Sequence, residues 1–147
     1  MKIAIGSDHR GYALKEQVKQ ALAAGGHQLA DHGTAGTTSC DYPDFAIPVA
    51  EAVAKGAAER GILICSSGNG MLIAANKVRG ARAAMAFTPE MARLSRLHND
   101  ANVLAIPADY LDPATVPAIV ATWLATGFEG GRHEQRLNKI KEYEDAR

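Results

Sequence analysis

The sequence predicts a three-layer α/β/α fold built on a five-stranded parallel, Rossmann-like sheet. Short apolar runs recur along the chain, and each is followed by a segment with helical periodicity. The runs place hydrophobic residues at consecutive positions, as in Ile62-Leu63-Ile64, which is typical of parallel strands covered by helices on both faces. Strand–helix units of about 25 residues favour right-handed crossovers.

Five strands are expected where apolar residues follow one another, at Lys2–Gly6, His27–Asp31, Gly61–Cys65, Ala81–Ala86 and Val103–Ile106. Six helices are expected where apolar residues recur every three or four positions, at Tyr12–Ala24, Asp44–Lys55, Gly70–Val78, Pro89–His98, Pro113–Ala125 and Arg132–Glu144. No repeat, linker or low-complexity stretch interrupts the alternation. We therefore expect one domain over residues 1–147.

Turn and capping residues mark several helix ends. The pair Gly25-Gly26 ends the first helix in the manner of a C-terminal glycine cap. The fourth and fifth helices begin at Thr88-Pro89 and Asp112-Pro113, where a capping residue precedes a proline at the first helical position. The last helix follows no strand of its own, so we expect an extra C-terminal helix that packs on a partner.

The composition argues against several classes of protein. Sixteen basic residues balance sixteen acidic ones, and aromatic residues make up only 5%, so nucleic-acid binding is not expected. The longest apolar run, near Ile119–Leu124, is too short to span a bilayer. Cys40 and Cys65 form neither a disulfide framework nor a zinc spacing. These features predict a cytoplasmic protein without a membrane partner.

Polar residues follow the predicted strands at their carboxyl ends, where sheets of this type bind ligands. They are Ser7-Asp8-His9, Asp31-His32, Cys65-Ser66-Ser67-Gly68-Asn69-Gly70 and Thr88. Asp8 and His9 suit acid–base chemistry or a phosphate contact, or else a helix cap beside an exposed imidazole. Together with Asp31 and His32 they lack a third ligand at fixed spacing, so no metal site is expected.

The loop that begins at Cys65 carries the strongest sign of chemistry. Its small residues allow a ligand to approach the backbone, and amides at a helix start favour an anion. The same helix dipole is expected to lower the pKa of the Cys65 thiol, which would make it a base or a nucleophile. Ser67 and the backbone amides would then hold an oxyanion. The alternative interpretation is a buried cysteine beside an ordinary tight turn.

This loop does not match the nucleotide-binding glycine motifs. Gly68-Asn69-Gly70 begins a dinucleotide fingerprint, but Ile73 occupies the position of the third glycine. The loop also follows the third strand rather than the first, and no Gly-Lys-Ser/Thr ending exists for a nucleoside-triphosphate loop. A phosphate- or nucleotide-binding module without catalysis therefore remains only an alternative.

Three further groups have both a functional and a structural interpretation. Arg132 and Arg136 share one helix face and oppose the dipole, so they bind an anion or form a solvated basic face. His98 and Asn99 close a helix, where histidine and asparagine are common without any catalytic role. Tyr42 lies in a turn before the second helix and contacts either a ligand or the core.

Taken together, the motifs resemble type B ribose-5-phosphate isomerase, a family that also includes the galactose-6-phosphate isomerase subunits. They occur in order over residues 1 to about 144, as Gly6-Ser7-Asp8-His9-Arg10-Gly11, Asp41-Tyr42-Pro43, Cys65-Ser66-Ser67-Gly68-Asn69-Gly70, Ile73-Ala74-Ala75-Asn76-Lys77, His98-Asn99-Asp100-Ala101-Asn102-Val103-Leu104 and Gly130-Gly131-Arg132-His133. The resemblance implies interconversion of D-ribose 5-phosphate and D-ribulose 5-phosphate without metal or cofactor.

The resemblance also assigns roles to residues. Cys65 is the base that moves a proton between two sugar carbons, and Ser67 supports the enediolate. The amides of Gly68, Asn69 and Gly70 form the oxyanion cradle. The remaining roles are ring opening by His98, proton handling at the sugar hydroxyls by Asp8, sugar contacts by Tyr42 and Asn99, and phosphate binding by His9, Arg132 and Arg136.

Two positions depart from the family pattern. Ser66 stands where the family usually has glycine, so its hydroxymethyl group narrows the pocket or adds a hydrogen bond to the substrate. A subgroup of the family uses a glutamate base just after the glycine turn, where this chain has Met71. Cys65 is therefore the only base candidate. Because one chain carries all the motif residues, we expect a homodimer or homotetramer with sites at the subunit interface.

Other functions stay open on the sequence alone. The same chemistry on allose 6-phosphate, galactose 6-phosphate or a tetrose phosphate is one alternative, because pocket length cannot be derived from the motifs. A cysteine hydrolase is another, and it would require a covalent intermediate and a histidine partner for Cys65.

Overall fold

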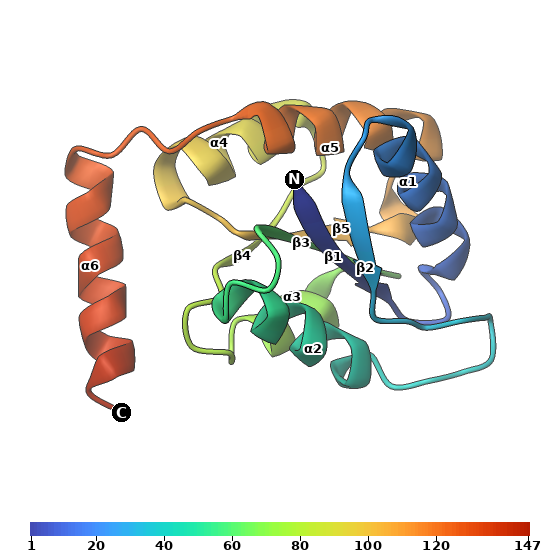
Figure 1. Cartoon of the computed structure of the whole chain (residues 1–147), viewed down its shortest axis with the longest axis horizontal. Helices are drawn as coiled ribbons and strands as arrows, with labels where there is room; N and C mark the ends of the chain where they lie inside the picture. The colour runs from blue at the N-terminus through green and yellow to red at the C-terminus, as the bar shows by residue number, and fades with distance from the viewer.

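The computed structural model describes residues 1–147 and contains a five-stranded sheet with the order β2-β1-β3-β5-β4 (Figure 1). All pairings are parallel. The strands are β1 (Lys2–Ser7), β2 (Gln28–Asp31), β3 (Arg60–Cys65), β4 (Ala83–Met85) and β5 (Val103–Pro107). The helices are α1 (Tyr12–Ala24), α2 (Pro43–Ala54), α3 (Asn69–Ala75), α4 (Pro89–Asn99), α5 (Val116–Ala125) and α6 (Arg132–Asp145).

Helices cover both faces of the sheet, which confirms the predicted three layers (Figure 1). One core lies between the sheet and α1, α4 and α5, and it includes Ile62, Ile64 and the fully buried Trp123. The other core lies against α2 and α3 and includes Leu63 and Cys65. Successive β3 residues thus face opposite cores, because side chains alternate along a strand. Both faces being buried explains the continuous apolar runs.

The helix ends follow the predicted caps in most places. Gly26 has φ of +83°, and the amide of His27 donates to the Leu22 carbonyl at 3.1 Å, as in a Schellman cap. Thr88 Oγ1 accepts from the Met91 amide at 3.1 Å at the start of α4. Thr88 is therefore a capping residue.

The predicted helix over Pro113–Ala125 is wrong in its first turn. Residues Pro113–Thr115 form a 3₁₀ turn, and the α-helix begins at Val116. Pro117 has no amide hydrogen, so it cannot donate to the carbonyl of Pro113 as an α-helix would require. Asp112 caps this 3₁₀ turn, because its Oδ1 accepts from the Ala114 amide at 2.9 Å.

The last helix stands apart from the layers. Helix α6 follows an extended segment after α5 and lies to one side of the sheet beyond β4 (Figure 1). Within it only His133 is buried, and its contacts with the body include those with α4. A pocket of about 560 Å³ separates α6 from the body and is lined on the body side by Arg79, Arg82 and Asp100. No helix of the chain has the length and apolar character needed to cross a membrane.

Candidate active site

The order of the strands places Asp8 next to Cys65. The chain leaves β1 for β2 on one side of the sheet, and β3 lies on the other side, so the ends of β1 and β3 form the switch point where sheets of this type bind ligands. Ser7 pairs in register with Ile64, and the Asp8 amide donates to the Ile64 carbonyl at 3.3 Å. Asp8 and Cys65 are 8% and 5% exposed. A carboxylate and a thiol therefore lie beside each other at this switch point, which is called the Cys65 site below.

The Cys65 thiol has a raised pKa, so the expected lowering is wrong. Burial is the largest cause, because a thiolate loses hydration in this environment. Backbone hydrogen bonds from Met71 and Gly68 act in the opposite direction, and the nearby Asp8 charge adds to the rise. Helix α3 has only seven residues, and its amides do not offset the burial. The resting group is a thiol that becomes a strong base once ionised.

The loop after Cys65 requires glycine at two positions. Gly68 has φ of +79°, and a Cβ there would lie 2.9 Å from Met85 Cε. A Cβ on Gly70 would lie 2.7 Å from the ring of Tyr42, so the Tyr42 ring covers this residue. Ser67 Oγ accepts from the Asn69 amide at 3.3 Å. The loop and the Tyr42 ring thus pack against each other at the Cys65 site.

Asp109 is a site-forming residue that the sequence reasoning missed. It lies just beyond β5, and its Oδ2 accepts from Ser66 Oγ and from an Arg10 guanidinium nitrogen, each at 2.6 Å. The hydrogen bond from Ser66 and then the one from Arg10 lower the pKa of this carboxyl. Asp109 therefore joins the loops after β1 and β3. Its place after a strand was the available signal, because such residues meet at one edge of a parallel sheet.

This contact also gives Ser66 a role. The Ser66 hydroxyl donates to Asp109, and the Asp109 amide donates to the Ser66 carbonyl at 3.0 Å. The serine in place of the usual family glycine thus adds a hydrogen bond within the protein rather than a free donor.

Asp8 and His9 are both fixed by neighbouring backbone. Asp8 Oδ1 accepts from the amides of Arg10 and Gly11, each at 3.0 Å, and so holds the turn before α1. The N-cap of α1 is Gly11, without a side-chain cap, so the helix-cap interpretation of Asp8 is wrong. His9 Nδ1 accepts from the Cys40 amide at 3.2 Å, which places the proton of a neutral ring on Nε2. The Cys40 amide therefore orients His9, and the Cys40 Sγ lies 3.7 Å from the same nitrogen.

The other predicted site residues lie at the opposite end of the sheet. His98 and Asn99 end α4 just before β5, and Arg132 and Arg136 lie in the first turns of α6 beside them. Val103 at the start of β5 pairs with Gly61, near the start of β3. Because a strand rises about 3.3 Å per residue, the length of β3 separates this group from Cys65 by roughly 15–20 Å. One chain does not bring the two groups together.

Within the His98–Asn102 segment, only His98 and Asn99 remain free for function. Asp100 has φ of +44° at the end of α4, and its carboxylate binds Arg96 at 2.8 Å and Arg82 at 2.9 Å. The Asn102 side chain accepts from the Arg82 amide and donates to the Gly80 carbonyl. Asp100 and Asn102 are therefore structural residues.

The His98 ring stacks on the ring of His133, with centroids 4.3 Å apart and planes 16° from parallel. The Glu129 carboxylate lies beside both rings, 3.7 Å from His98 Nε2 and 3.4 Å from His133 Nε2. Burial, then the His98 charge and the Arg132 charge, lower the pKa of His133. No sequence pattern indicated that Glu129 and His133 lie against His98.

A model of the Ribose/Galactose Isomerase family matches residues 3–140. The chain belongs to this family. It is 44% identical to ribose-5-phosphate isomerase B of Escherichia coli over 146 residues, which are 99% of this chain and 98% of that protein. The solved structure of the Clostridium thermocellum enzyme of the same name is 51% identical, covers 99% of both chains and has a TM-score of 0.98.

A third relative was solved with a ligand. Ribose-5-phosphate isomerase B of Mycoplasma genitalium, with bound ribulose-5-phosphate, is 39% identical and has a TM-score of 0.95. The alignment covers 99% of this chain and 97% of that one. These matches thus confirm, over nearly the whole chain, the family resemblance that the sequence motifs indicated.

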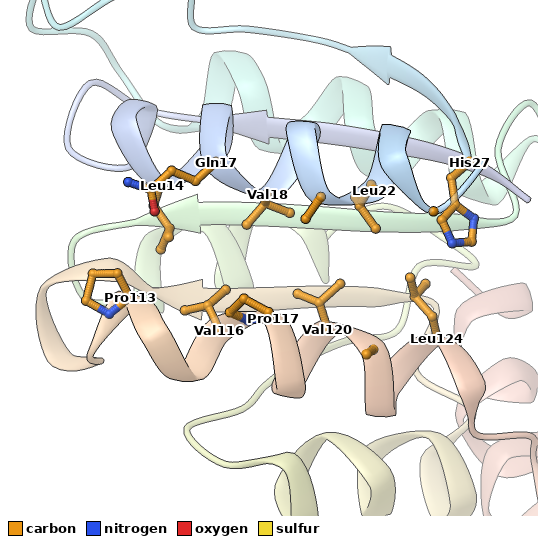
Figure 2. A pocket seen from close by; sticks show the side chains of 13 residues that line it. Leu14, Gln17, Val18, Leu22, His27, Pro113, Val116, Pro117, Val120 and Leu124 are labelled. Carbon is orange, nitrogen blue, oxygen red and sulfur yellow. The ribbon is translucent and has the colours of Figure 1, made fainter.

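Two other features of this chain lie away from the Cys65 site. Asp31 Oδ1 lies 2.7 Å from the buried Lys15 amine and Oδ2 lies 2.6 Å from Lys19, so Asp31 belongs to an ion-pair network. Figure 2 shows an apolar pocket of about 320 Å³ between α1 and α5, with Val18, Leu22 and Val120 among its lining residues. None of the predicted site residues lines that pocket.

The raised pKa of Cys65 predicts how this thiol reacts. With Cys40→Ser, Cys65 is the only thiol, and its rate of alkylation by iodoacetamide reports the thiolate fraction. We expect the rate to rise with pH to a midpoint above that of the same chain in denaturant, because burial disfavours the anion. A midpoint below that of the denatured chain would contradict the raised pKa and support the lowered pKa expected from the helix dipole.

Proposed function

We propose that the chain interconverts D-ribose 5-phosphate and D-ribulose 5-phosphate through an enediolate. The observation that carries this proposal is the buried Cys65 thiol beside Asp8, with backbone amides of the glycine turn hydrogen-bonded to the sulfur. Proton removal next to a carbonyl needs a base at the carbon and donors where negative charge develops. Met71, at the position of the alternative base, carries no proton acceptor of this kind.

The proposed roles divide the reaction among residues of the Cys65 site. Cys65 takes the proton from one sugar carbon and returns it to the next. Ser67 and the turn amides stabilise the enediolate oxygen. Asp8, whose Oδ1 is held by two amides, moves protons at the sugar hydroxyls, and Tyr42 contacts the sugar. A base, an acid and oxyanion donors are thus available without a metal or a cofactor.

We further propose that two copies of the chain complete each site. His98, Asn99, Arg132 and Arg136 lie at the opposite end of the sheet from Cys65, so the ring-opening and phosphate-binding groups would come from a second copy. The position of α6 beside the body supports this arrangement, because its exposed face is free to meet a partner (Figure 1). His9 would contact the phosphate from the Cys65 side. A homodimer, or a tetramer built from such dimers, satisfies this requirement.

An assay of four-, five- and six-carbon aldose phosphates tests the reaction and its substrate. We expect the highest kcat/KM on ribose 5-phosphate and no loss on addition of EDTA. Higher activity on galactose 6-phosphate, allose 6-phosphate or a tetrose phosphate would keep the mechanism and change the substrate. Binding of ribose 5-phosphate without turnover of any sugar would favour a non-catalytic phosphate-binding module. A burst of released product, with a covalent intermediate accumulating on the enzyme, would favour a hydrolase.

The arginine pair is expected to act chiefly in substrate binding. Arg132→Ala and Arg136→Ala should each raise KM about ten- to a hundredfold, since a charge-assisted phosphate contact contributes roughly 1.5–3 kcal/mol. The comparison variant is Lys139→Ala, an exposed cation later in the same helix. Steady-state kinetics on ribose 5-phosphate measure the effect. Unchanged KM in both arginine variants would make them a solvated basic face.

A further inference from the structure

The cluster of His98, Glu129 and His133 joins α4, the segment after α5, and α6, three parts of the chain that are distant in sequence. One ligand atom from each residue lies within 4.8 Å of the other two. No other group of three or more histidine, cysteine or acidic side chains in the molecule is arranged in this way. The cluster thus brings two imidazoles and a carboxylate to one point.

The two histidine–carboxylate spacings of the cluster are close to those of a tetrahedral zinc site. Zn²⁺ binds imidazole nitrogen and carboxylate oxygen at about 2.0–2.2 Å, so two ligands of a tetrahedral site lie roughly 3.4 Å apart. Glu129 Oε2 lies 3.4 Å from His133 Nε2 and 3.7 Å from His98 Nε2. Two histidines and one glutamate also form a known donor set for sites that keep one open position.

Completing the coordination requires the His98 ring to move. The two rings are stacked, so the His98 ring must turn about its Cβ–Cγ bond before its Nε2 can face the same ion as His133 Nε2. His98 is 36% exposed, so its ring has room to turn, and Glu129 is 55% exposed. His133 is almost fully buried and would be the fixed ligand. The positive charge of Arg132, next to His133, opposes a cation and should limit the affinity.

We propose that His98, Glu129 and His133 bind one Zn²⁺ per chain in the micromolar range, and that the bound ion inhibits the enzyme. The second part rests on the proposed function, in which His98 opens the sugar ring. A metal ion on His98 Nε2 would occupy the lone pair that such proton transfer requires. The ion would therefore act as a reversible inhibitor and take no part in the reaction.

Calorimetric titration of ZnCl₂ into the EDTA-treated, dialysed full chain tests the binding. The Cys65→Ala, Cys40→Ser double variant removes both thiols, so thiolate binding cannot contribute. We expect one Zn²⁺ per chain, and at least a tenfold loss of affinity with either Glu129→Gln or His133→Asn added. Co²⁺ should give the visible absorption of a tetrahedral ion. Glu134 is an exposed carboxylate in the same helix as His133, so the chain with Glu134→Gln should bind Zn²⁺ as before.

The outcomes separate the two parts of the proposal. No saturable binding, or equal affinity in the Glu129→Gln and Glu134→Gln chains, would overturn the metal site whatever the enzyme's activity. In the chain with Cys65 intact, micromolar Zn²⁺ should inhibit turnover of ribose 5-phosphate, EDTA should restore it, and Glu129→Gln should be less sensitive. Binding at this cluster with undiminished turnover would overturn the inhibition alone.

Discussion

Cys65→Ala is expected to lower kcat on ribose 5-phosphate by about 10²–10⁴-fold, the effect of removing a positioned general base. The chain should fold normally, because the smaller side chain removes one sulfur atom from the core against α2 and α3. KM should change little, since the proposed phosphate contacts come from other residues. Steady-state kinetics and thermal unfolding of the purified variant measure all three quantities.

The matched control is Cys40→Ser. This change keeps the Cys40 amide that donates to His9 and replaces only the sulfur, so kcat should stay close to that of the wild type. Solvent-deuterium exchange at the sugar carbon adds a second readout, because it should disappear with Cys65→Ala and persist with Cys40→Ser. A Cys65→Ala chain within a few-fold of wild-type kcat would contradict the thiol mechanism and would direct attention to Asp8.

The fold could be predicted from the sequence because its signals are local. Apolar runs mark strands buried on both faces, and capping residues such as Thr88 act on amides only three residues away. The error at Pro113–Thr115 is also local: Pro117 lacks the amide hydrogen that an α-helix needs there. The fourth strand, expected over Ala81–Ala86, covers only Ala83–Met85 and lies at the edge of the sheet.

The site was only partly predictable because several of its properties depend on tertiary contacts. The helix-dipole rule gave the wrong direction for the pKa of Cys65, since burial of the thiol outweighs the amides of a seven-residue helix. Asp109 reaches Ser66 and Arg10 across three strand ends, and no sequence spacing encodes that contact. The motif residues Asp100 and Asn102 proved to be structural for the same reason: their arginine and backbone partners are supplied by the fold.

The separation of Cys65 from His98 has a consequence for the assembly. Because β3 and β5 run parallel, the residues after β3 and those before β5 lie at opposite ends of the strands. A rotation of α6 alone would not close the gap, because His98 is carried by α4, which packs against the sheet layer. In a two-fold dimer, by contrast, each copy can present its His98 end to the Cys65 end of the other.

A heterodimer of two inactive variants is therefore expected to recover about half of the wild-type activity. One copy carries Cys65→Ala and the other His98→Asn, each of which alone should lower kcat by roughly 10²-fold or more. In a two-fold dimer with shared sites, one site receives both substitutions and the other receives none. Co-expression with two different affinity tags isolates the mixed dimer, and its turnover of ribose 5-phosphate is compared with that of each parent.

The reciprocal heterodimer makes the result decisive. Here one copy carries both Cys65→Ala and His98→Asn, and its partner is wild type. If the two residues meet across the interface, each site has one defect and the dimer stays inactive. If they act within one chain, the wild-type copy alone supplies half of the activity. Recovery in this second dimer but not in the first would contradict the shared site, and with it the role given to the face of α6 that carries Arg132 and Arg136.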